Sequence, residues 1–235
     1  MTRWLRGDDG NPLLNGPFLL RNLTQPGLQR YMIDTPLSVQ ATNPMLFDGI
    51  FYDGALASPY PNMSTARMGR ENDAVNTVAL AISEALSARA HVAGAHQVIG
   101  NGLAQYHASN PVFPADDGVG MVPWMDGVCV EHWAAFEMTS TGNCSLFPAM
   151  VLDMMERIAA TAAQNKTVLV KGWPGPVTTP ITSLGPSLPA ACNASAGGGA
   201  THAARAATAA QWFEPSYALF LLVADNTVYW SYSWW

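Results

Sequence analysis

The chain has 235 residues, which is enough for one large domain with a hydrophobic core. Hydrophobic residues make up 49% of it and charged residues 12%, and the net charge is −6 at pH 7. The acidic balance and the lack of a basic stripe argue against nucleic-acid binding by phosphate neutralisation. No apolar run approaches the roughly 20 residues of a membrane-spanning helix.

The chain begins with a loop-rich lead-in over residues 1–40, whose second half carries a helical pattern from about residue 26. From residue 41 to 235, short apolar runs typical of buried strands alternate with helical patterns. We expect strands over residues 45–53, 96–103, 127–133, 167–173 and 226–232. Helices are expected over residues 71–90, 147–164 and 200–212, with Pro215 in the first turn of a further helical segment.

Buried strands separated by helices predict parallel β/α units, so the fold class is α/β in a single domain over residues 1–235. Five strands fit either an open doubly wound sheet or part of a closed barrel. No GxGxxG or GxxxxGK[ST] motif follows any strand, which weakens the nucleotide-binding version of the open sheet.

Two carboxylates are expected where a β/α fold places its chemistry, at the carboxyl ends of strands. Asp53 ends the run FDGIFYD, and Glu131 lies near the end of GVCVEHW. One carboxylic acid at such an edge can protonate a glycosidic oxygen while the other stabilises or attacks the sugar carbon. Each residue could instead form a salt bridge or cap a loop.

Five further residues are candidate sugar-binding groups because they lie at or near strand ends. They are Asn101, Trp133, Lys171, Trp173 and Tyr229. The aromatic rings could stack on the apolar faces of sugars, and the amide and ammonium groups could bind hydroxyl groups. Core packing is the alternative for the aromatic residues, and a turn is the alternative for the Asn-Gly pair.

Other chemistries lack their motifs. The histidines form no HExxH pattern and no cysteine pair forms CxxC, so we expect no metal site and no cofactor. No GxSxG nucleophile elbow is present. Cys129 is expected to be buried, whereas pairing of Cys144 with Cys192 stays open.

The order of these motifs resembles strands four to eight of glycoside-hydrolase-like (β/α)₈ barrels. FDGIFYDG, a strand ending in Asn-Gly, GVCVEHW, TVLVKGW and NTVYWSYSWW follow one another as in hypothetical glycosyl hydrolases that carry a DG[IV]F.D motif. The opening stretch from WLRGDDGNPLL to LQRYMIDT is similar to the segment before that motif. Polygalactosaminidase-type barrels are more distant in pattern.

The resemblance implies an incomplete (β/α)₈ barrel, since strands one to three have no counterpart before residue 45. It assigns the nucleophile to Asp53 and makes Glu131 the best match for the acid/base. The expected activity is hydrolysis of O-glycosidic bonds in a poly- or oligosaccharide. The alternatives are a non-catalytic carbohydrate-binding protein on the same scaffold and an isomerase or aldolase that uses Lys171.

Five acceptor triplets for N-linked glycans, at Asn22, Asn62, Asn143, Asn165 and Asn193, predict a secreted protein, although the first ten residues carry no apolar signal region. The sugar, the linkage, the anomeric outcome and the oligomeric state do not follow from the sequence.

Overall fold

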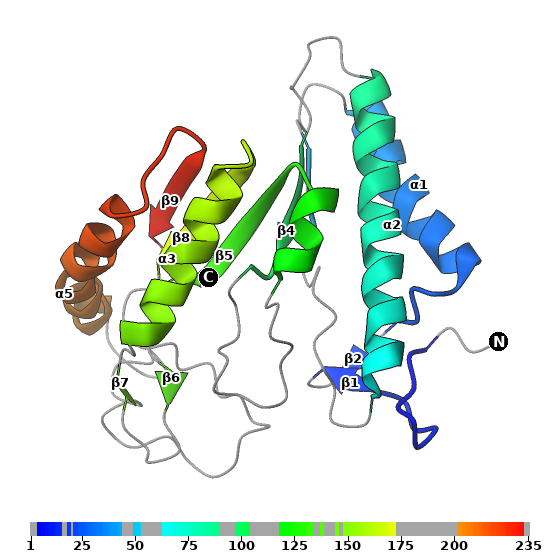
Figure 1. Cartoon of the computed structure of the whole chain (residues 1–235), viewed down its shortest axis with the longest axis horizontal. Helices are drawn as coiled ribbons and strands as arrows, with labels where there is room; N and C mark the ends of the chain where they lie inside the picture. Colours follow the sequence, from blue (N-terminus) through cyan, green and yellow to red (C-terminus); the bar gives the residue numbers. More distant parts are fainter. Residues whose placement is uncertain are drawn as a thin grey trace. The chain divides into compact units, whose positions relative to one another are not determined.

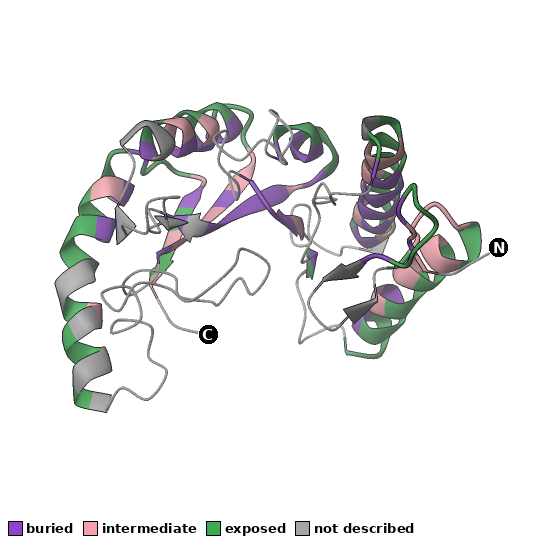
Figure 2. Ribbon diagram, turned by 90° about the horizontal axis from the view of Figure 1, so that it is seen from below, coloured by how far each residue is buried: buried purple, intermediate pink, exposed green. Residues whose placement is uncertain are grey.

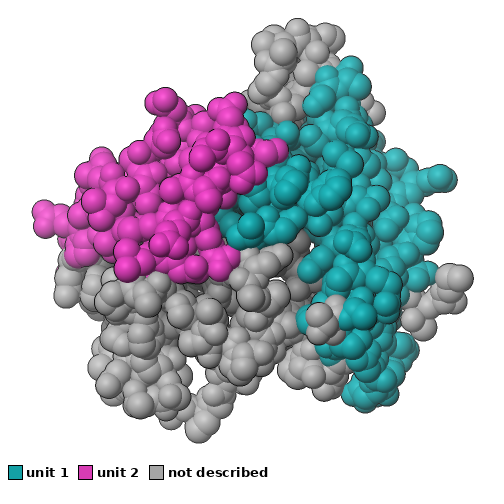
Figure 3. Space-filling model, in the orientation of Figure 1, with its two compact units in different colours: residues 1–129 teal, residues 130–235 magenta. Residues whose placement is uncertain are grey.

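The computed structural model describes residues 4–15, 18–19, 21–43, 49–52, 63–89, 97–103, 118–133, 137–138, 144–145, 148–172 and 202–232. Its elements in chain order are β1 (Leu14–Asn15), β2 (Phe18–Leu19), α1 (Pro26–Thr42), β3 (Gly49–Tyr52), α2 (Thr65–Arg89), β4 (Gln97–Asn101), η1 (Val119–Trp124), β5 (Gly127–Trp133), β6 (Glu137–Met138), β7 (Cys144–Ser145), α3 (Pro148–Ala162), β8 (Thr167–Gly172), α5 (His202–Leu221) and β9 (Val228–Tyr232) (Figure 1). The chain divides into two compact units, residues 1–129 and 130–235 (Figure 3).

The main sheet has five strands in the order β3-β4-β5-β8-β9. The pairs β3–β4, β4–β5 and β8–β9 are parallel. This arrangement confirms the α/β fold class. Among the described residues the sheet is open, with β3 and β9 at its two edges.

The five predicted strands are all present, and β5 has the predicted bounds. The expectation that Pro215 begins a new helix is wrong, because α5 continues through it as one helix. A proline inside a helix loses a backbone hydrogen bond and crowds the preceding turn. Aromatic contacts of the residues before and after Pro215 offset this cost, since Phe213 and Tyr217 each contact Trp230, with centroid distances of 5.4 and 4.9 Å.

In the first unit, α2 packs against α1, β4 and η1. One side of α2 is buried, as Figure 2 shows, because its apolar residues recur at helical spacing, among them Val78, Ile82 and Leu86. The helix is also tied to the sheet through Asp126. Its Oδ2 accepts hydrogen bonds from the Ser83 hydroxyl and the Val98 N–H, both at 2.9 Å.

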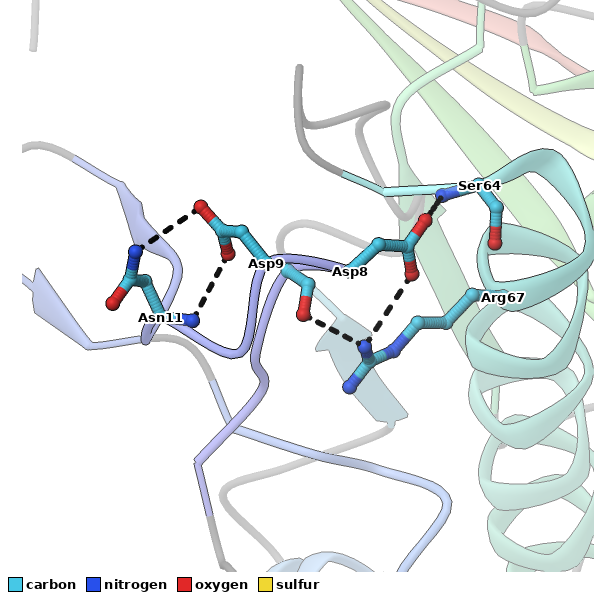
Figure 4. A network of polar contacts seen from close by, with 6 residues as sticks. Asp8, Asp9, Asn11, Ser64 and Arg67 are labelled. Atoms are coloured by element: carbon cyan, nitrogen blue, oxygen red, sulfur yellow. Dashed lines mark hydrogen bonds and ion pairs between the residues drawn. The ribbon is translucent and has the colours of Figure 1, made fainter.

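The segment before α1 is folded against the amino end of α2. Leu5, Leu13 and Met63 form a small apolar cluster there. Asp8 Oδ2 accepts the Ser64 N–H at 2.7 Å, and Arg67 donates to the Gly7 carbonyl at 3.1 Å (Figure 4). A carboxylate at this position satisfies a backbone donor at the helix start and is favoured by the helix dipole.

In the second unit, α3 and α5 pack against β8. Val168, Val170 and Gly172 are buried on one face of β8, and the register places Val228, Trp230 and Tyr232 of β9 beside them. Trp230 and Tyr232 form an aromatic cluster with Phe213 of α5. A Cβ at position 172 would lie 2.6 Å from Ser216 Oγ, so glycine permits the close packing of α5 on β8.

No helix among the described residues is long and apolar enough to cross a membrane.

Candidate functional site

Four of the predicted site residues lie in the carboxyl-terminal parts of strands: Asn101, Glu131, Trp133 and Lys171. Tyr229 is instead the second residue of β9. Two others lie outside the described residues. These two are Asp53, which directly follows Tyr52 of β3, and Trp173, which directly follows Gly172 of β8. Asn101, Glu131, Trp133, Lys171 and Tyr229 are described.

Asn101 is the last residue of β4 and is only 2% exposed. In the register it lies beside Cys129 of β5, which is buried as expected. The next two backbone N–H groups, of Gly102 and Leu103, both donate to the Cys129 carbonyl at 3.2 Å. The Asn-Gly pair therefore ends the strand in a turn, which was the alternative to sugar binding, and the Asn101 amide is enclosed within that turn region.

A second glycine closes over this turn. Gly118 adopts a left-handed backbone with φ of 90°, and a Cβ there would lie 2.5 Å from the Gly102 carbonyl oxygen. The conformation and the close approach both require glycine. The carboxyl end of β4 is thus shaped by backbone that comes from the start of η1.

Glu131 is the fifth residue of β5 and is 8% exposed. The strand around it is apolar and buried, with Val128 and Val130 fully enclosed (Figure 2). Transfer of an ionised carboxylate into such surroundings is costly unless polar groups or charges compensate. Glu131 is therefore a buried acidic side chain between apolar residues, in the carboxyl-terminal half of β5.

Trp133 has the geometry of a packing residue. It is 1% exposed, and its indole N–H donates to the Ser216 carbonyl of α5 at 3.2 Å. A ring enclosed in this way has no free face for a sugar. The structure favours core packing, the alternative that the sequence left open for Trp133.

Lys171 and Tyr229 share one face of the β8–β9 pair. The register places Leu169 beside Tyr229 and Lys171 beside Ser231. Tyr229 is 56% exposed and Lys171 is half-buried. This face is opposite the one that carries Trp230 towards α5, so the Tyr229 ring is accessible whereas the Trp230 ring is part of the aromatic cluster.

Sequence reasoning missed the polar residues that position these strands. Ser216 lies in an alanine-rich helix and Asp126 in a turn before β5, and neither carries a motif. No signal in the sequence distinguishes them from solvated residues, because their roles depend on partners 28 to 83 positions away.

In the described part of the chain, no group of three His, Cys, Asp or Glu side chains lies close enough together to bind a metal ion. Cys144 lies in β7 and Cys192 lies outside the described residues, so their pairing stays open. No protein-family model and no curated protein matches the sequence. Any assignment of function therefore depends on the residues of the site.

Proposed function

We propose that the chain is part of a glycoside-hydrolase-like (β/α)₈ barrel that hydrolyses O-glycosidic bonds of a poly- or oligosaccharide. Asp53 and Glu131 are its two carboxylates. The observation that carries the proposal is the burial of Glu131 in the carboxyl-terminal half of a central parallel strand. Catalytic groups of β/α barrels come from this part of their strands.

Each carboxylate has a defined task in this chemistry. Glu131, as the acid, protonates the glycosidic oxygen as the bond to the sugar carbon breaks. Asp53, as the anion, attacks the same carbon or activates a water molecule. Separations of about 5–5.5 Å between the carboxyl groups give retention, and about 6.5–9.5 Å give inversion.

Substrate contacts are assigned to Tyr229 and Lys171, which share a face at the edge of the sheet. The exposed Tyr229 ring offers an apolar surface to a sugar ring, and the Lys171 ammonium offers hydrogen bonds to hydroxyl groups. Asn101 and Trp133 are the last residues of β4 and β5, and both are buried.

The test is a screen of chromogenic glycosides and polysaccharides with the wild type and three variants. Glu131→Gln and Asp53→Asn should each reduce kcat/KM by about 10²–10⁴-fold, the usual contribution of a general acid or base. Glu156→Gln is the matched control, because Glu156 is exposed on α3. Circular dichroism and thermal unfolding verify that the variants fold. Full activity in Glu131→Gln would end the assignment.

A non-catalytic carbohydrate-binding protein is the second candidate, and the exposure of Tyr229 favours it because sugar stacking needs no carboxylate pair. Calorimetric titration with oligosaccharides separates the two functions. A binding protein keeps its affinity in Glu131→Gln, loses it in Tyr229→Ala and hydrolyses nothing.

A further inference from the structure

Two complete acceptor triplets for N-linked glycans lie in the described part of the chain, Asn22-Leu23-Thr24 and Asn165-Lys166-Thr167. Neither triplet has proline in its middle position, so both meet the sequence requirement. Their surroundings differ, and this difference distinguishes the two sites.

The first triplet is packed against α2. Asn22 is half-buried, and its Oδ1 accepts hydrogen bonds from the N–H and the hydroxyl of Thr24 at 3.1 and 2.5 Å. The N–H of Leu23, the middle residue, donates to Glu71 Oε2 at 3.2 Å. A glycan on Asn22 would have to fit beside this buried carboxylate.

The second triplet begins in an open turn. Asn165 is exposed, follows α3 and has φ of 58°, and its backbone N–H donates to the Ala162 carbonyl at 2.8 Å. Asparagine is one of few non-glycine residues that adopt this left-handed conformation readily. Within the part of the chain that the structure describes, no hydrogen bond involves its side-chain amide. Thr167 then opens β8 in extended backbone.

We propose that Asn165 is an acceptor for an N-linked glycan. The donor is an oligosaccharide carried on a lipid pyrophosphate. The Asn165 amide nitrogen attacks C1 of the first sugar and forms the N–C1 bond. The bond from C1 to the pyrophosphate oxygen breaks, the lipid pyrophosphate leaves with the bonding electrons, and the amide nitrogen loses one proton.

The position of Asn165 separates a glycan from Lys171, the residue of β8 that is assigned to substrate contacts. Asn165 lies before the amino end of β8, whereas Lys171 lies near its carboxyl end. Thr167 and Gly172 are five residues apart, which corresponds to about 17 Å along a strand. A bulky modification at Asn165 is therefore compatible with an open carboxyl edge, and the inference does not depend on the proposed hydrolase activity.

The experiment directs the full chain into the endoplasmic reticulum of cultured eukaryotic cells with a cleavable signal peptide. The purified protein is treated with a peptide N-glycanase in ¹⁸O-labelled water, which converts each glycosylated asparagine into labelled aspartate, and peptides are mapped by mass spectrometry. We expect the label at position 165 in the wild type and in Thr167→Ser, which keeps the acceptor triplet.

Asn165→Gly removes the acceptor and suits the left-handed turn, because glycine adopts positive φ without a steric penalty. This variant should lack the glycan at position 165 and unfold in urea at the same or a higher midpoint. Recovery of unlabelled Asn165 from wild-type protein, whether secreted or retained in the cells, would overturn the proposal. Equal glycan mass on wild type and Asn165→Gly would overturn it as well.

Discussion

Replacement of Gly172 by alanine should destabilise the protein through a contact that only the folded chain contains. The added Cβ would lie 2.6 Å from Ser216 Oγ, 3.1 Å from Trp230 Nε1 and 3.1 Å from Tyr232 Cδ2. Forcing a methyl group into a packed site costs about 1–3 kcal/mol. Alanine recovers about 0.4–1 kcal/mol by lowering the entropy of the unfolded chain. The net loss should be about 1–2 kcal/mol, measured by urea unfolding.

The same substitution at Gly69 is the matched control. Gly69 lies on α2, and a Cβ there meets nothing within 4 Å. Alanine is about 0.8–1.0 kcal/mol more favourable than glycine in a helix interior. Gly69→Ala should therefore raise the free energy of unfolding while Gly172→Ala lowers it.

A double-mutant cycle with Ser216→Ala tests the origin of the loss. Ser216 Oγ is buried and forms no hydrogen bond with any residue that the structure describes, so its removal alone should be neutral or slightly stabilising. In the Ser216→Ala background, Gly172→Ala should cost less, with a coupling energy of about 1 kcal/mol or more. An unchanged cost in that background would refute the packing of α5 on β8 as described.

Three further predictions follow from polar groups and are checked by equilibrium unfolding. Asp126→Ala leaves the Val98 N–H and the Ser83 hydroxyl without their acceptor and should lower the free energy of unfolding by about 2–3 kcal/mol. Ser83→Ala removes one of the two hydrogen bonds and should lower it by about 1 kcal/mol. Equal losses in the two variants would contradict the shared acceptor. Burial raises the pKa of Glu71, although the hydrogen bond from Leu23 and the charges of nearby arginines oppose the shift. The folded state therefore binds the proton more tightly than the unfolded state, and the free energy of unfolding should fall as pH rises above the ordinary pKa of 4.5. Glu71→Gln should flatten this pH dependence. Burial also raises the pKa of Tyr232 to about 12, so the free energy of unfolding should fall as pH rises from 10 towards 12. An ultraviolet titration should find this tyrosine ionising last. A pKa near 10 for Tyr232 would exclude the described burial.

The sequence was sufficient for the elements of the sheet. The apolar runs at residues 127–133 and 167–173 correspond to β5 and β8, because short runs rich in β-branched and other apolar residues favour buried strands. Tyr229 and Trp230 are neighbours in β9, and the alternation of side chains along a strand directs them to opposite faces. These features are local, so the residues themselves encode them.

Which face is covered was decided only by tertiary structure. Trp230, Tyr229 and Trp133 are all aromatic residues of strands, but their surroundings differ. Rings of α5 contact Trp230, whereas Tyr229 is exposed. Trp133 is buried, and its indole N–H donates to the Ser216 carbonyl. Pro215 remains inside α5 for the same reason, since packing on Trp230 outweighs the local preference. Burial depends on which distant segments arrive beside a residue, and no local pattern carries that information.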